Sequence, residues 1–495
     1  MESVKYKLMG GAMAALILVC ALAASALEAG EGPSRVHQHL SARGPDAGCD
    51  CDGTQLCTHL PLVIIDTGGQ EIPGVPNGEE DYYGEELYTT AEDGTDFINV
   101  QVTVIDNEDQ NNHPSDTPDF TTASQFRIRG HASRHFEKSP YLLKFIDEDG
   151  EDNPISVMGM GAHNEWVLNG PYLDKSLIRN YLCYNLAGEI MEYAPNVRYC
   201  ELIVDGDYRG LYLMVESITA GDDCRLNLRS TVKDSSITGY LLRLDRTVEE
   251  EVGSTRDIYT YMERMIFVRD DESIRYPGKN RLTEELAREI ELEYSAFEKA
   301  LYSYDYDTEE YGYWNYIDVD NFVDYFIINE FTRNVDSGRY STYLYKELGE
   351  KYKLCVWDFN NAMDNFPDDE ITTENFALSD RVWYDMLFRD EEFAERVIER
   401  YWELRRTVLS DAYLNRYIDE TLEWLGPAID RNTERWRESI EEWEPLTPEE
   451  RNVYSQEEAV DQVRHWLHER GEWLDENIQA LQARAHPSRN HAYNH

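Results

Sequence analysis

The stretch from Asn329 to Phe366 constrains the fold of this chain more than any other part of its sequence. Two β-branched and aromatic runs, Ser341 to Tyr345 and Tyr352 to Trp357, are separated by a glycine-containing break. This pattern predicts a β-hairpin. A hairpin brings its two outer ends together, and Asp336 and Asp358 lie just outside those ends. We therefore expect the two carboxylates to be neighbours.

Two neighbouring carboxylates beside Asn360 form a candidate site for a hard cation. Mg²⁺ prefers oxygen ligands, which carboxylate and amide side chains supply. Enzymes that transfer phosphoryl groups need a cation held in this way. The alternative is that Asp336 and Asp358 are solvated loop residues in a chain with 97 acidic residues. This stretch alone leaves both interpretations open.

The charge balance restricts the partners. The chain has 495 residues, of which 97 are acidic and 46 are basic, so its formal net charge is -51. Such a surface repels nucleic acid and anionic membranes, so we expect no nucleic-acid partner. A site for a polyanion such as ATP must overcome this field with a lysine, an arginine or a metal ion close by.

The first 26 residues have the pattern of a targeting segment. Two lysines precede an apolar run from Leu8 to Ala26 that holds no charged residue and ends in an Ala-Ser-Ala cleavage pattern. This predicts a secretory signal peptide over residues 1–26 and an exported protein. An uncleaved membrane anchor is the alternative, because the run approaches the length of a spanning helix. Residues 27–59 are rich in small and polar residues and are expected to be a linker.

The cysteines permit more than one interpretation. The sequence has eight of them, and export would permit disulfides. Removal of the signal peptide leaves an odd number, so at least one thiol stays free or pairs between molecules. Cys49, Cys51 and Cys57 lack a CxxC pair and have only His59 nearby in the sequence. Zinc binding is therefore the minority interpretation of this cluster.

The segment from residue 60 to residue 250 has the pattern of short strands. Phe126 to Gly130 and Pro140 to Ile146 flank a glycine-containing loop, and Lys144 projects from the second strand. A strand from Gly210 ends at Glu216, where the carboxylate could pair with Lys144, as in kinases. The alternatives are an exposed strand lysine and an ordinary strand-end carboxylate. Further strands are expected at Leu60 to Asp66, Phe97 to Ile105, Val197 to Val204 and Gly239 to Asp245, the last in the same sheet as the strand ending at Glu216.

Amphipathic patterns predict helices, most of them in the second half of the chain. The helix that ends near Phe331 delivers Asp336 at its carboxyl end. Tryptophans in the later helices are expected to lie in the core, and residues 486–495 are expected to be disordered. The predicted helices are Asp174 to Met191, Glu284 to Tyr302, Asp318 to Phe331, Glu391 to Val408, Ala412 to Leu425, Ile429 to Ile440 and Glu457 to Leu481.

Six segments carry a resemblance to a known family. They are FRIRGHAS followed by PYLLKF, a W-x-L then D-x-S-x-I-R-N run, VDGDYRGLYLMVE, GYLLRLD, NVDSGRYSTYLYK and VWDFNNAMDN. In this order the chain resembles the CotH family, named for spore coat protein H, whose members are atypical secretory-pathway-like protein kinases. Each segment alone is a weak signal, and their shared order makes the match specific.

The resemblance implies an α+β, atypical protein-kinase-like fold over residues 60–485. A mixed or antiparallel sheet lobe would span residues 60–250, and a mainly helical lobe would span residues 251–485. The nucleotide phosphates would lie on the sheet lobe, and the helical lobe would complete the site.

The resemblance also implies roles for individual residues on the sheet lobe. Lys144 would bind the phosphates of ATP, and Glu216 would be its ion-pair partner. Arg129 and Ser133 fall in the phosphate loop, which the family writes R-G-N-S-S. Here that loop reads R-G-H-A-S, which weakens the assignment.

Asp336 would be the catalytic aspartate that accepts the proton of the acceptor hydroxyl. Asp358 would hold Mg²⁺ or Mn²⁺, with Asn360 as a second ligand in place of the aspartate seen in many members. Asp364, where a glycine is common, adds a charge nearby. The implied reaction is transfer of the γ-phosphoryl group of ATP to a Ser or Thr of a protein, in spore coat or cell-surface assembly.

Three alternatives from other classes stay open. The chain could be a catalytically inactive kinase-fold scaffold or binding protein of an extracellular or coat assembly. It could be a surface protein that buffers cations through its acidic residues. The same groups could also catalyse nucleotidyl transfer, if the nucleotide lay in a different orientation.

Overall fold

The structure is a computed structural model that describes residues 44–45, 48–80, 86–107, 109–219, 225–226, 228, 238–244, 274–278 and 281–489. The predicted signal peptide or anchor, residues 1–26, lies outside these ranges, as does much of the predicted linker. Within the described ranges, no helix combines the length and the apolar character needed to cross a membrane.

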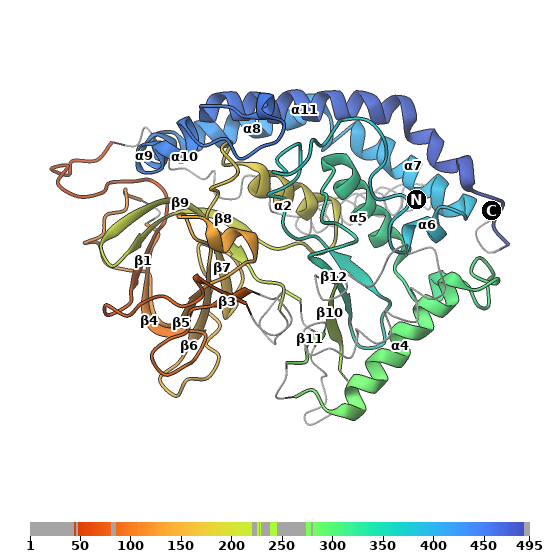
Figure 1. The fold of residues 1–495 in the computed structure, drawn as a ribbon, viewed down its shortest axis with the longest axis horizontal. Helices are drawn as coiled ribbons and strands as arrows, with labels where there is room; N and C mark the ends of the chain where they lie inside the picture. Colours follow the sequence, from red (N-terminus) through yellow and green to blue (C-terminus); the bar gives the residue numbers. More distant parts are fainter. Residues whose placement is uncertain are drawn as a thin grey trace, which may run out of the picture.

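Seven strands close into a barrel, which forms the left part of the molecule in Figure 1. Around the barrel the strands follow the order β1-β4-β5-β6-β7-β9-β8. They are β1 (Leu62–Asp66), β4 (Ile98–Ile105), β5 (Phe120–Ile128), β6 (Tyr141–Ile146), β7 (Glu165–Asn169), β8 (Val197–Val204) and β9 (Asp207–Glu216). A separate two-stranded ribbon is formed by β2 (Pro76–Glu80) and β3 (Glu86–Tyr88).

The closed barrel corrects the predicted fold class. β1 pairs antiparallel with β4 on one side and parallel with β8 on the other, where Leu62 lies opposite Glu201. The remaining neighbours in the barrel are antiparallel. Because every strand has two partners, no edge is left, and the expected two-lobed kinase arrangement with a mixed or antiparallel sheet lobe is wrong. Alternate side chains such as Val63, Leu143 and Trp166 fill the barrel interior.

A second, four-stranded antiparallel sheet lies beside the barrel (Figure 1). Its order is β11 (Ile274–Tyr276), β10 (Tyr240–Leu244), β12 (Thr342–Lys346) and β13 (Lys353–Cys355). The predicted hairpin is confirmed as β12–β13, with Leu344 opposite Leu354. The prediction that β10 belongs to the sheet of β8 and β9 is wrong, because Leu242 of β10 pairs with Leu344 of β12.

The helices largely follow the predicted spacing. Small polar side chains accept backbone N–H groups at the starts of three helices, as is common at this position: Thr283 for α4 (Glu284–Tyr302), Asp318 for α5 (Val319–Thr332) and Ser410 for α8 (Asp411–Leu425). The predicted helix from Ile429 to Ile440 is broken at Trp436. The α-helices are α2 (Arg179–Ile190), α4 (Glu284–Tyr302), α5 (Val319–Thr332), α6 (Tyr384–Leu387), α7 (Glu391–Arg405), α8 (Asp411–Leu425), α9 (Pro427–Arg435), α10 (Arg437–Glu441) and α11 (Gln456–Asn477); 3-10 turns are η1 (Ala132–His135), η3 (Tyr313–Asn315), η4 (Glu449–Arg451) and η5 (Ile478–Arg484).

One apolar core joins the outside of the barrel to the helices. It runs from Tyr199 and Leu213 on the barrel wall through Leu344 of the second sheet to Phe322 of α5 and Leu467 of α11. Burial of apolar surface is the main favourable term in folding, so the parts on this core stabilise one another. The sheet-rich and helical regions are therefore packed together through a shared core, unlike the two lobes that were expected.

The chain end is partly ordered against the helical region. His486 lies 2.7 Å from the hydroxyl of Tyr306, and Arg489 donates to a carboxylate oxygen of Asp307 at 2.8 Å. Residues 490–495, the rest of the segment predicted to be disordered, lie outside the described residues.

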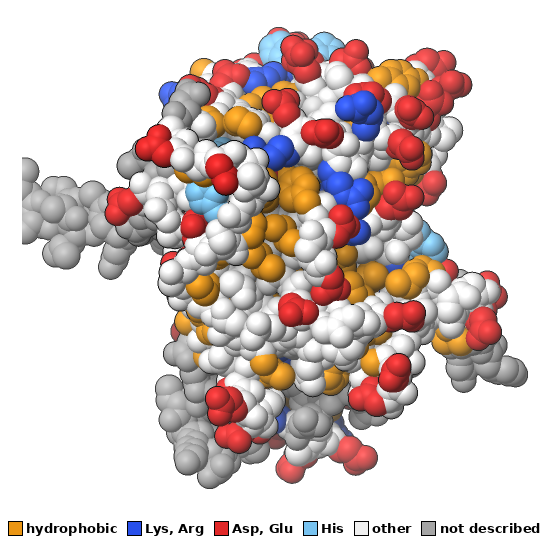
Figure 2. Space-filling view, turned by 90° about the vertical axis from the view of Figure 1, so that its left-hand side faces the viewer, with side chains coloured by type: hydrophobic (Ala, Val, Ile, Leu, Met, Phe, Trp, Pro, Cys, Tyr) orange, Lys and Arg blue, Asp and Glu red, His pale blue; other side chains and the backbone are white. Residues whose placement is uncertain are grey.

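Acidic side chains are spread over the face of the molecule drawn in Figure 2. Lysine and arginine lie mainly in its upper half, beside an exposed hydrophobic area. The acidic excess is thus dispersed on this face and does not form a single patch.

Candidate functional site

Asn334 joins the two loops that leave the β12–β13 hairpin. Helix α5 ends at Thr332, and Arg333 turns the chain with a left-handed φ of 45°. The buried amide of Asn334 then donates to the backbone oxygen of Asp358 at 3.0 Å and accepts from the backbone N–H of Asp336 at 3.4 Å. One side chain therefore holds the two aspartate-bearing loops against each other.

A second side-chain amide, that of Asn361, also links the two loops. Asn361 donates from its side chain to a carboxylate oxygen of Asp336 at 3.1 Å. The side chain of Asp358 accepts from the backbone N–H of Asn360 at 3.2 Å, which fixes the direction of this carboxylate. Both aspartates are half-buried. The loops that carry Asp336 and Asp358 are thus joined through the side chains of Asn334 and Asn361.

The loop after β13 holds a strained backbone. Asp358, Met363 and Asp364 have φ values of 55°, 52° and 59°, in the left-handed region that side-chain-bearing residues rarely adopt. Such residues persist only where the surrounding structure over-determines them, and they concentrate at functional sites. The three left-handed residues therefore mark the loop after β13 as a candidate site.

The first turn of α2 supplies the contacts that hold this loop. The buried guanidinium of Arg179 pairs with Asp174 at 2.6 Å and donates to the backbone oxygens of Ala362 and Met363 at 3.1 and 3.2 Å. Asn180 accepts from the backbone N–H of Phe359 at 2.8 Å. The D-x-S-x-I-R-N run is therefore a clamp on the Asp358 loop.

Asn360 is already engaged by this clamp. Its side-chain oxygen accepts from the side chain of Asn180 at 2.7 Å, and its backbone oxygen accepts from Asn365 at 2.7 Å. An amide oxygen has two lone pairs, so one remains for a cation. Asp364 is turned elsewhere, because it pairs with Arg451 at 2.8 Å.

Lys144 and Glu216 are not brought together. Lys144 alternates along β6 with Leu143 and Phe145, which face the barrel interior, so its side chain lies on the outer wall. There it pairs with Asp152 at 2.8 Å, on a surface where both side chains are more than a third exposed. Glu216 follows Met214 along the inner side of β9. The two side chains therefore leave the barrel wall on opposite sides.

Glu216 is buried among neutral donors. Its carboxylate accepts from the hydroxyl of Tyr193 at 3.1 Å and from the backbone and side chain of Asn196 at 3.2 and 2.9 Å. Burial raises the pKa of Glu216 to about 7, and these hydrogen bonds oppose the shift. A lysine partner would have lowered this pKa.

Arg129 lies beside the Asp358 loop, while Ser133 lies within its own turn. The guanidinium of Arg129 stands over the ring of Trp357, 5.5 Å from its centre, next to Asp358 in the chain. Ser133, in η1, packs against Gly130, whose φ is 101°. A Cβ at Gly130 would lie 2.1 Å from the Ser133 hydroxyl oxygen, so this position requires glycine. The Arg129 side chain therefore places a positive charge over the residue that precedes Asp358.

The family comparison accounts for the segments that form this site. A family model described as CotH kinase protein matches residues 126–474. The chain belongs to the CotH family. The match begins within β5 and ends in α11, so it contains the hairpin, both aspartate loops and the clamp from α2. The comparison with curated proteins found no match for the chain.

The CotH match leaves the first part of the barrel outside it. β1 and β4 precede Phe126, yet β1 closes the barrel by pairing with β8. Closure of the barrel in this protein therefore depends on a segment that the family model does not cover.

Two site residues were missed in the sequence. Asn361 follows Asn360 in the N-N pair after the W-D-F segment, and only the structure shows that it contacts Asp336. The hydroxyl of Tyr184 accepts from the backbone N–H of Asp358 at 3.1 Å. Tyr184 lies at helical spacing after Asn180, so the predicted helix was the available signal for its position.

Proposed function

We propose that this CotH-family protein transfers the γ-phosphoryl group of ATP to a Ser or Thr hydroxyl of a protein, with Mg²⁺ or Mn²⁺. The family description names a kinase, which supports this reaction class. The observation that carries the proposal is Asn334, because its amide contacts both aspartate loops. Because residues 1–26 have the pattern of a secretory signal peptide, we propose that the enzyme acts outside the cytoplasm, at a cell surface or spore coat.

The residues present fit a magnesium or manganese ion. Asp358 offers a carboxylate, and Asn360 keeps one free lone pair on its amide oxygen. Asp336 lies on the adjoining loop, where Asn361 donates to its carboxylate, and Arg129 places a positive charge over the ring of Trp357. A bound divalent ion would neutralise charge on the phosphates.

Asp336 would act on the acceptor hydroxyl. Hydrogen bonds from Asn361 and to Asn334 fix the loop and direct the carboxylate. In the proposed step the hydroxyl oxygen bonds to the γ-phosphorus, the bond from this phosphorus to the β,γ-bridging oxygen breaks, and Asp336 takes the hydroxyl proton. Positioning and charge neutralisation supply most of the rate in such reactions.

Labelled ATP tests the proposal. The full chain is incubated with γ-labelled ATP, Mn²⁺ and a generic acceptor protein, beside Asp336→Asn, Asp358→Asn and the exposed control Asp368→Asn. We expect label on the acceptor or on the chain itself. Both site variants should lose at least about 100-fold in rate, as for loss of a general base or a metal ligand.

The control variant should retain the wild-type rate, and all three variants should unfold at nearly the wild-type temperature. Transfer that survives in Asp336→Asn and Asp358→Asn would reject the assignment of these two residues.

One observation favours a second candidate, a catalytically inactive scaffold. Lys144, expected to bind phosphates, is held on the outer barrel wall by Asp152. If the chain is a scaffold, we expect no label transfer and no ATP-dependent rise in melting temperature.

If the chain is an enzyme in which Arg129 replaces Lys144 at the phosphates, we expect label transfer to be lost in Arg129→Met and kept in Lys144→Met.

A further inference from the structure

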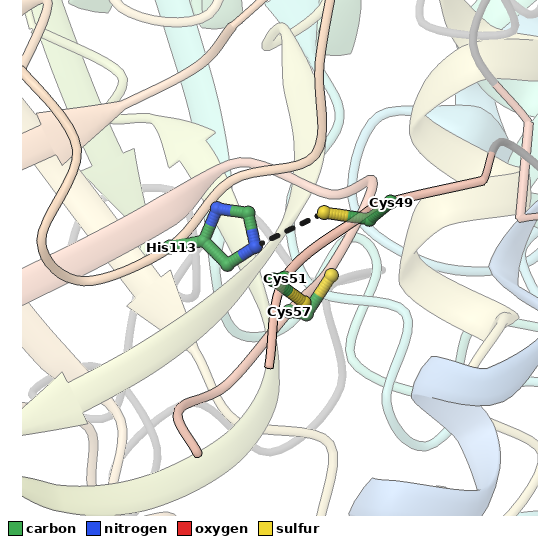
Figure 3. A group of neighbouring side chains, drawn as sticks. All are labelled: Cys49, Cys51, Cys57 and His113. Carbon is green, nitrogen blue, oxygen red and sulfur yellow. Dashed lines mark hydrogen bonds between the residues drawn. The ribbon is translucent and has the colours of Figure 1, made fainter. Parts of the chain in front are cut away.

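Three cysteines and a histidine gather at one point outside the proposed catalytic site. They are Cys49, Cys51, Cys57 and His113, and Figure 3 shows their side chains together. The three sulfur atoms and an imidazole nitrogen all lie within 4.8 Å of one another. Cys49 Sγ and His113 Nε2 are 3.4 Å apart. All four residues precede Phe126, so they lie outside the segment matched by the CotH model.

The spacing suits a tetrahedral metal ion. Bonds of about 2.3 Å to sulfur and about 2.0 Å to nitrogen put adjacent ligand atoms of a zinc site roughly 3.5 to 3.8 Å apart. The separation between Cys49 and His113 is close to this value. A disulfide needs sulfur atoms about 2.05 Å apart, and all three cysteines are free thiols in the structure.

Hydrogen bonds around the cluster prepare it for a cation. The other ring nitrogen of His113, Nδ1, lies 3.1 Å from a carboxylate oxygen of Asp116, which also accepts the backbone N–H of His113 at 2.9 Å. A carboxylate at Nδ1 leaves the lone pair of Nε2 facing the cysteines, as in zinc sites. Asn111 donates to Cys57 Sγ at 3.2 Å, a contact that favours thiolate.

The backbone aligns the two segments that meet here. Thr58 and Asn112 exchange two backbone hydrogen bonds, of 3.2 and 2.6 Å, in an antiparallel bridge. The side chain of Asn112 also donates to the backbone oxygen of Leu60 at 2.9 Å. Both Thr58 and Asn112 are buried. The cluster is thus placed by contacts that do not involve the cysteines themselves.

His59, the neighbour that the sequence suggested, is not part of the cluster. Its Nε2 lies 2.5 Å from the backbone oxygen of Trp424 at the end of α8. The histidine that completes the set comes from the loop before β5, more than fifty residues along the chain. This distance explains why the sequence made zinc the minority interpretation.

We propose that Cys49, Cys51, Cys57 and His113 bind one Zn²⁺ in a closed structural site. Four protein ligands fill a tetrahedral zinc ion and leave no position for a substrate, so the site has no catalytic role. The ion fastens the segment before β1 to the loop between β4 and β5. This inference is independent of the proposed phosphoryl transfer.

The test begins with the metal content of the untagged full chain, purified without chelator. We expect about one zinc per chain by mass spectrometry of the metal, and loss of that zinc in Cys57→Ser and His113→Ala. The matched control is His135→Gln, an exposed histidine elsewhere, which should keep its zinc. Zinc content that is the same in both ligand variants as in the wild type would overturn the proposal.

Cobalt substitution tests the geometry in the wild-type protein, which avoids any folding defect of a variant. Replacement of zinc by Co²⁺ should give the intense visible bands of a tetrahedral thiolate complex. Asp116→Asn should keep these bands and weaken cobalt affinity about 10- to 100-fold, the usual effect of losing a partner of a metal-bound histidine.

Alkylation and mass spectrometry of the wild-type chain decide between zinc and a disulfide. Three thiols that are protected until a chelator is added support the metal site. A disulfide between any two of Cys49, Cys51 and Cys57 in the purified chain, with no bound zinc, would overturn it.

Discussion

At the scale of single residues, Glu216 distinguishes a carboxyl group buried among neutral donors from one paired with a lysine. Its carboxylate accepts hydrogen bonds from Tyr193 and Asn196, and burial raises its pKa to about 7 from an ordinary value of 4.5. A raised carboxyl pKa means that the folded state binds the proton more tightly than the unfolded chain does. The stability from this group is present below about pH 4.5 and is lost as pH rises through 7.

Glu216→Gln should remove this loss. The neutral amide cannot ionise, so the variant should gain on the wild type by about 3 kcal/mol between pH 4.5 and pH 8, as the shift of the pKa implies. Chemical unfolding of both proteins at the two pH values measures this difference. A variant that instead loses stability relative to the wild type at pH 8 would indicate that Glu216 is ionised beside a cation, as a lysine partner would require.

The same residue shows where sequence reasoning reached its limit at the proposed catalytic site. Asp336 and Asp358 were predicted to meet because a hairpin fixes the distance between its own ends. Lys144 and Glu216 were predicted to pair, and the structure gives each of them other partners. A correct prediction would have needed to know which side chains of each strand face the barrel interior. That choice is made by packing partners such as Leu143 and Met214, not by local pattern.

At the scale of elements, the first turn of α2 holds the loop that carries Asp358. Arg179 is fully engaged by Asp174, Ala362 and Met363, and it holds a loop with several left-handed residues. Removal of one partner from a buried, hydrogen-bonded ion pair leaves an uncompensated charge.

Arg179→Met should therefore cost about 3 to 5 kcal/mol of unfolding free energy, measured by chemical denaturation. Arg396→Met is the matched control, because Arg396 pairs with the exposed Asp320 on the surface and should cost less than about 1 kcal/mol. Equal costs for the two substitutions would show that the clamp does not hold the Asp358 loop.

Most elements could be predicted from their own residues. α4 matches its predicted bounds, and α5 differs from them by one residue at each end, because amphipathic spacing and a capping side chain act locally. α2 begins later than predicted, since Asp174 accepts the backbone N–H of Arg179 and Leu177 adopts a φ of 68°. Polar contacts of this kind compete with the helix and leave no periodic signal.

At the scale of the whole molecule, the pairings between distant segments could not be predicted. β1 and β8 lie far apart in the sequence and are parallel, and β10 leaves the barrel strands that precede it to pair with β12. Both choices depend on long-range contacts, which strand patterns do not specify. The closed barrel and the shared core therefore emerged only from the structure.

The cluster of three cysteines and His113 also depends on contacts between segments that lie far apart in the sequence. Cys49, Cys51 and Cys57 were visible in the sequence, but His113 joins them only through the bridge between Thr58 and Asn112. The proposed zinc site could therefore be recognised only from the fold, and its test is the metal content of the purified chain.

Binding of Mn²⁺ in the presence of ATP tests most directly whether the joined loops form one nucleotide site. Equilibrium dialysis would measure the Mn²⁺ bound to the wild-type chain, to Asp358→Asn and to the surface control Asp368→Asn, with ATP present on both sides of the membrane or absent. We predict a tight Mn²⁺ site that appears only with ATP in the wild type and the control, and that is lost in Asp358→Asn. Tight ATP-dependent binding that persists in Asp358→Asn, or its absence from the wild type, would contradict the site built on Asn334, Asp336 and Asp358.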